Sequence, residues 1–125
     1  MSYAKRHRVS VTTAADGSGE AYTPALTGRL VNIVYTKTDF ADTVDFAITA
    51  ESSGLNLWTE ANVTASKTVS PRQATHTTAG VANATAGDVL LSDIYLAQDR
   101  VKIVIAQGGA AKVGTFDIIV EGPTG

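Results

Sequence analysis

Apolar and polar residues alternate along most of this chain, and that alternation limits the fold more than any other feature of the sequence. Clear runs stand at 44–48, 101–105 and 116–120. A period of two is typical of β-strands that place one face in a core, and no stretch keeps a helical period. The sequence therefore predicts an all-β fold, a single-domain antiparallel β-sandwich that is jelly-roll or Greek-key-like.

The spacing of these runs places one domain over residues 9–122, which is long enough to bury a core of its own. The nearly continuous apolar run at 28–38 predicts a central strand that is covered on both faces. The run at 89–97 fits a strand or one short helix. Residues 100–106 and 113–121 flank a glycine-rich turn and predict a hairpin.

The alternation is interrupted in two places. Residues 1–8 have no core pattern, and we interpret them as an extended basic N-terminal arm outside the sandwich. From residue 71 to 87, threonine, alanine, glycine and asparagine dominate. An unpatterned loop of that length is uncommon in a compact domain unless it is functional or disordered, so 71–87 is predicted to be a long loop with a binding role.

Charge is distributed unevenly along the chain. The formal net charge is −2, which argues against a dedicated nucleic-acid binder. Three basic residues stand within the first eight positions, whereas the other 117 residues carry seven basic and twelve acidic groups. Two interpretations of this basic start are open: a disordered, solubilising terminus, or an arm that docks on an acidic neighbour or on packaged nucleic acid.

Several kinds of chemistry find no support in the sequence. The chain has no cysteine, which excludes disulfides and thiolate sites. No apolar run approaches the ~20 residues of a membrane helix, and no secretory signal is visible at the start. We expect no enzyme activity, cofactor or metal: the two histidines lack a nucleophile motif, and the aspartates at 39, 42 and 45 match a solvated turn better than a calcium loop.

Six residues are candidates for contact with a partner. Loops and charged clusters carry binding more often than strands do. Trp58 is predicted on the face opposite its inward neighbours, where it would cover a sheet edge or meet a partner. Arg72 opens the loop and could hold a partner carboxylate in a bidentate pair. The six candidates are Lys5, Arg6, Arg8, Trp58, Arg72 and His76.

One resemblance covers most of the chain beyond the first residues. The segments that carry it lie at 22–24, 28–30, 35–40, 44–49, 57–63, 71–76 and 99–109, including Leu57-Trp58-Thr59-Glu60-Ala61-Asn62-Val63 and Pro71-Arg72-Gln73-Ala74-Thr75-His76. In these segments the chain resembles a family of small structural proteins of tailed-bacteriophage virions, of the kind that decorate or cement the capsid. The shared motifs are strands and turns and carry no chemical signature. The resemblance implies a phage structural protein.

Within that family, size, strand pattern and arm favour a capsid decoration protein that binds the major capsid protein. We expect a small homo-oligomer, a dimer or a trimer, made in the bacterial host cytoplasm and located on the capsid surface of the virion. The alternative is a head–tail connector, or a tail or fibre component with a receptor- or glycan-binding role.

Overall fold

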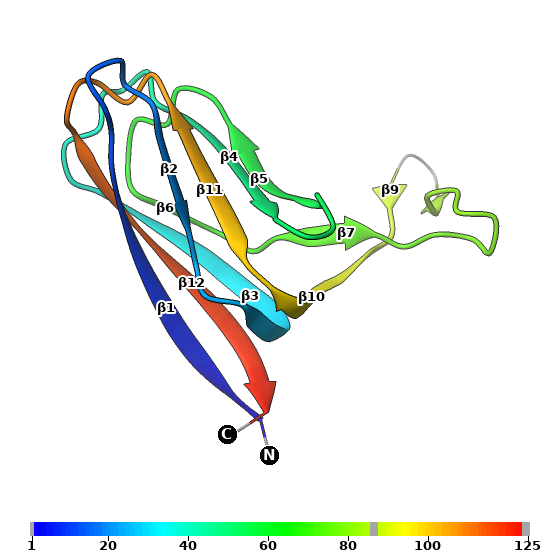
Figure 1. The fold of residues 1–125 in the computed structure, drawn as a ribbon. Coiled ribbons are helices and arrows are strands. Elements are labelled where there is room, and N and C mark those ends of the chain that lie inside the picture. The colour runs from blue at the N-terminus through cyan, green and yellow to red at the C-terminus, as the bar shows by residue number, and fades with distance from the viewer. Residues whose placement is uncertain (1, 86–87, 124–125) are drawn as a thin grey trace.

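The computed structural model describes residues 2–85 and 88–123, and it confirms the all-β sandwich (Figure 1). The larger sheet has the strand order β1-β12-β3-β10-β7, with β6 also paired to β3. Its strands are β1 (Ser2–Thr12), β3 (Leu26–Lys37), β6 (Lys67–Val69), β7 (Arg72–Ala74), β10 (Leu91–Asp99) and β12 (Val113–Pro123).

The smaller sheet has the order β2-β11-β4-β5. It consists of β2 (Gly19–Tyr22), β4 (Asp45–Ala50), β5 (Asn56–Glu60) and β11 (Val101–Ala106), and all the pairings in both sheets are antiparallel. A separate two-stranded ribbon, β8 (Ala84–Thr85) and β9 (Asp88–Val89), lies to one side of the sandwich (Figure 1).

An aromatic cluster joins the two sheets at the centre of the core. Tyr35 of β3 and Phe116 of β12 come from the larger sheet, and Phe46 of β4 comes from the smaller one. The ring of Phe46 meets those of Tyr35 and Phe116 edge to face, with centroids 4.7 and 5.0 Å apart. Edge-to-face pairs add stability beyond the apolar area that they bury, so this cluster ties the sheets together.

The predicted hairpin of residues 100–106 and 113–121 is wrong. β11 pairs with β2 and β4 in the smaller sheet, whereas β12 pairs with β1 and β3 in the larger one. The connection at 107–112 crosses from one sheet to the other, with positive φ at Gln107, Gly109 and Ala111. Alternation alone cannot separate a hairpin from such a crossing, because both place the same side chains in the core.

The central position of the 28–38 run is confirmed, but its cover on both faces is not. β3 lies between β12 and β10, and Leu30, Ile33 and Tyr35 are buried while Val31 and Val34 are only half-buried. A bulge explains the run of apolar residues: Ile119 pairs with Asn32 and Val120 with Leu30, so that Val31 is an extra residue.

Within the predicted arm at 1–8, the described residues 2–8 belong to a strand, because β1 begins at Ser2 and pairs with β12 in register from Ser2↔Pro123 to Thr12↔Val113. The chain ends of the described structure therefore lie side by side (Figure 1). The inward side chains become more exposed toward the start: Val11 is buried, His7 is half-buried, and Tyr3 is 39% exposed. The apolar pattern is lost there because the smaller sheet no longer covers the inner face of β1, although β1 itself continues.

The described part of the segment 71–87 is not a plain loop, because residues 72–74 form β7. The segment at 89–97 is strand and not helix: Val89 ends β9, β10 begins at Leu91, and Leu91 to Asp93 pair with β7. The described intervening residues, 75–85 and 88–90, which we call the extension, are held by backbone hydrogen bonds such as Thr75 N–H to Leu90 O at 2.8 Å. The extension projects from the side of the sandwich (Figure 1). Residues 86 and 87 lie outside the described residues.

Candidate interaction surface

The basic residues of β1 divide between its two faces because successive side chains of a strand point in opposite directions. Arg6 and Arg8 point to the outer face of the larger sheet, where both contact Asp117 of β12. Arg6 Nη1 lies 2.7 Å from Asp117 Oδ2, and Arg8 Nε lies 2.9 Å from Oδ1. Two guanidinium groups thus share one carboxylate, which leaves this cluster with a net positive charge.

Asp117 is the buried member of that cluster, with 2% of the side chain exposed. The hydrogen bonds that Arg8 and Arg6 donate hold the pKa of Asp117 below its usual range, against the opposing effect of burial. An aspartate in the middle of the apolar run 116–120 was the sequence signal for a salt-bridge partner, and the sequence reasoning missed it.

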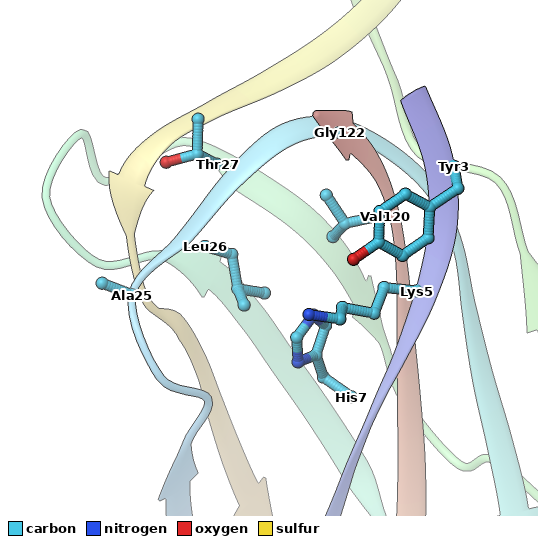
Figure 2. Close-up of a pocket in the computed structure, with 8 residues that line it drawn as sticks. All are labelled: Tyr3, Lys5, His7, Ala25, Leu26, Thr27, Val120 and Gly122. Carbon is cyan, nitrogen blue, oxygen red and sulfur yellow. The ribbon is translucent and has the colours of Figure 1, made fainter. Parts of the chain in front are cut away.

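Lys5 and His7 point to the other face, into the open end of the sandwich (Figure 2). With Tyr3, Leu26 and Val120 they line a pocket of about 250 Å³. Burial, and secondly the nearby Lys5 ammonium, lowers the pKa of His7. Lys5 Nζ lies 5.8 Å from the centroid of the Tyr3 ring. Within residues 2–85 and 88–123, no carboxylate lies within salt-bridge distance of Lys5.

Trp58 is not on the face that the sequence predicted. A bulge between β4 and β5 places both Leu57 and Trp58 in the core, and Trp58 is only 7% exposed. Its ring packs edge to face on Phe46 at 5.2 Å, and its Nε1–H donates to Glu60 Oε1 at 3.0 Å. Trp58 therefore offers no open ring surface to a partner.

Arg72 is already engaged within the chain. Its Nε lies 3.1 Å from Asp93 Oδ1, and Asp93 also lies 3.8 Å from Arg29 Nη1. Arg29 in turn pairs with Glu121 at 3.1 Å. These four residues form a row of alternating charges across β12, β3, β10 and β7 on the outer face. Arg72 thus stabilises the sheet edge, and a partner carboxylate would have to compete with Asp93.

His76 lies in the extension, exposed, and forms an isolated backbone bridge with Ala82. The sequence reasoning overlooked the apolar residues around it. Large apolar side chains are strongly exposed there and on the adjacent β10: Val81, Leu90, Leu91 and Tyr95 are exposed by 62, 51, 61 and 70%. These exposed apolar side chains are candidates for contact with another molecule.

The aspartates at 39, 42 and 45 do not form a common site. Asp39 Oδ1 accepts the Val113 N–H, Asp45 Oδ1 accepts the Asn62 N–H, and Asp42 pairs with Lys37. Among the residues that the structure describes, no group of three histidine or acidic side chains is arranged to hold a metal ion. The same residues contain no helix that could cross a lipid bilayer.

Comparison with known proteins adds no family to this description. No protein-family model matches the chain, and no curated protein matches its sequence.

Proposed function

We propose that this chain is a bacteriophage structural protein, a capsid decoration (cement) protein that binds the major capsid protein and stabilises the shell. The observation that carries the proposal is a sandwich with a basic strand edge at one place and exposed apolar side chains at another. The basic half of β1 lies at one end, and the extension leaves from another side (Figure 1). Large apolar side chains are exposed on the extension and on the adjoining β10. A protein built in this way can contact two neighbouring shell subunits at once.

The chemistry of the two surfaces suits such a bridging role. Exposed apolar residues of the extension can supply buried area, while the unpaired charge of β1 can orient the protein on an acidic neighbour. In this proposal the protein is made in the host cytoplasm and ends on the capsid surface. A homo-oligomer, dimer or trimer, would multiply these contacts by symmetry.

The proposal is tested by counting copies in purified particles. A decoration protein should approach the abundance of the major capsid protein by quantitative mass spectrometry, and cryo-electron microscopy should place it on the outer shell. A count of about a dozen copies or fewer, as ring symmetry demands of a connector, would instead favour the head–tail alternative. Location at a tail or fibre would also overturn the decoration role.

The glycan-binding alternative depended mainly on Trp58, and the buried Trp58 ring cannot stack on a sugar. A receptor role at a fibre and a decoration role predict different locations of the protein in the particle. Two variants and a control add a functional test. Leu91→Ser and Tyr95→Ser should each reduce shell occupancy, whereas the control Thr59→Ala, on the smaller sheet, should not. Unchanged occupancy for both serine variants would remove the extension and its adjoining strand from the interface.

A further inference from the structure

The first half of β1 has one edge that no strand of the described structure pairs with. β1 is the outermost strand of the larger sheet and pairs only with β12, along eleven residues. The opposite edge is formed by β7, which has three residues, and the edge strands of the smaller sheet, β2 and β5, have four and five. Long free edges are the places where another chain can add a strand.

The charge of this edge favours one kind of added strand. Lys5, Arg6 and Arg8 all carry positive charge, and no acidic residue stands among the first eight positions. Pairing of two β1 strands from two copies would bring like charges together, which destabilises a sheet. Asp117 neutralises only one of the two guanidinium groups beside it, and Lys5 has no carboxylate partner among the described residues. An acidic strand is therefore the complementary occupant.

The pocket at the open end offers a place for side chains of the added strand. The inward row of β1, Tyr3, Lys5 and His7, leads to a floor that includes Leu26 and Val120 (Figure 2). In strand addition, backbone hydrogen bonds supply affinity, and pockets beside alternate side chains supply specificity. A carboxylate entering here would meet the Lys5 ammonium, and the apolar part of its side chain would meet the floor.

We propose that the free edge of β1 binds an extended acidic segment of a partner protein as an additional antiparallel or parallel strand, with Lys5 receiving one of its carboxylates. The identification of that partner with a shell subunit rests on the proposed function. The binding mode itself is a property of this chain and is testable without particles.

The probe is a capped nine-residue peptide in which glutamate alternates with valine and threonine, and the control peptide carries lysine in place of every glutamate. Isotope-labelled protein is titrated with each peptide at low salt, and backbone amide shifts and amide exchange are followed by NMR. We expect shifts confined to residues 2–10 and the pocket, slower exchange of β1 amides on the free edge, and a Kd of about 1 mM. Raising the salt to about 150 mM should weaken binding several-fold.

Two variants with the same charge change separate a specific edge from general attraction. Lys5→Glu should weaken binding of the acidic peptide about tenfold, as loss of a close charge pair and its replacement by repulsion predict. Lys102→Glu on β11 of the smaller sheet should change it less than twofold, because only long-range charge is altered.

The inference would be overturned if no β1 amide shifted up to about 5 mM peptide, a range that covers weak complexes. It would also be overturned if the lysine peptide bound equally well, or if both variants weakened binding of the acidic peptide equally. Self-association through β1 without peptide would also contradict it, since the charge argument excludes a second copy. If the peptide binds but Lys5→Glu still occupies shells normally, decoration stands and β1 serves another partner. If the peptide fails while shell binding persists, only the binding mode is wrong.

Discussion

At the scale of single residues, two buried polar groups differ in whether they have hydrogen-bond partners. The carboxylate of Asp117 accepts hydrogen bonds from Arg6 and Arg8, while the Tyr35 hydroxyl is buried without a hydrogen-bond partner among the described residues. A buried polar group contributes to stability only when its lost hydration is replaced. The two residues therefore predict opposite results for near-isosteric substitutions.

Asp117→Asn should lower the free energy of unfolding by about 1–2 kcal/mol near neutral pH, because charge-assisted hydrogen bonds are lost. Since the pKa of Asp117 is lowered in the folded protein, its contribution is present above the unfolded pKa and disappears as pH falls through the folded pKa. Urea unfolding from pH 7 down to pH 2 should show the difference between the two proteins shrinking. Asp42→Asn, whose side chain is 70% exposed, serves as the control.

Tyr35→Phe should be neutral or stabilising at pH 7, because it removes a buried hydroxyl that has no partner and keeps the ring contacts. Burial, and secondly Asp42, raises the pKa of Tyr35 to about 12. The unfolded chain releases this proton first, so stability should fall as pH rises above 10 in the parent protein. The phenylalanine variant should lose less stability over that range. A loss of more than about 1 kcal/mol at pH 7 would contradict an unsatisfied hydroxyl.

At the scale of elements, the start of the chain contributes to stability because it forms strand β1. Seven of its eleven pairings with β12 involve residues 2–8. Deletion of residues 1–8 should therefore lower Tm by roughly 10 °C, because it exposes the edge of β12 and uncovers Asp117. Thermal unfolding by circular dichroism measures this effect. A truncated protein with unchanged Tm would restore the interpretation of these residues as an arm.

The extension should behave in the opposite way, because no side chain described in it, at 75–83 and 90, belongs to the buried core. Ala74 and Leu91 are paired across β7 and β10, so a two-residue Asn-Gly turn can join them directly in place of residues 75–90. This variant should keep its Tm or gain a few degrees, since a shorter loop costs less entropy to close. Loss of cooperative unfolding would show that the extension supports the core.

Much of this element-level description follows from the sequence, and each exception has its own physical cause. Alternation identified the runs at 44–48, 101–105 and 116–120, which the structure places in β4, β11 and β12. It misplaced Trp58 because a bulge shifts the alternation by one residue at Leu57. It also missed β1 before Val9, since a strand that leaves the core loses its apolar face while keeping its hydrogen bonds. Contacts between distant residues, such as Arg8 with Asp117, leave no local pattern.

At the scale of the whole molecule, the first and last described residues are neighbours, since Ser2 pairs with Pro123. A circular permutant with joined termini, opened between Gly80 and Val81 in the extension, should therefore keep the fold and a single unfolding transition. Opening the chain between Gly109 and Ala110 is the matched control. That connection is tied by hydrogen bonds such as Ala41 N–H to Gly108 O at 3.0 Å, so cutting it should destabilise the protein. Equal stability of the two permutants would contradict this prediction.

The sequence by itself determined that the chain is a β-sandwich and which side chains form most of its core, because alternation follows directly from the geometry of a strand. Only the tertiary structure decided which sheet each strand joins, that 107–112 crosses between sheets, and that the basic residues 5–8 form an edge strand with a pocket behind them. The physical reason is that the hydrophobic effect selects a face for each side chain but does not distinguish between the sheets on either side of one core.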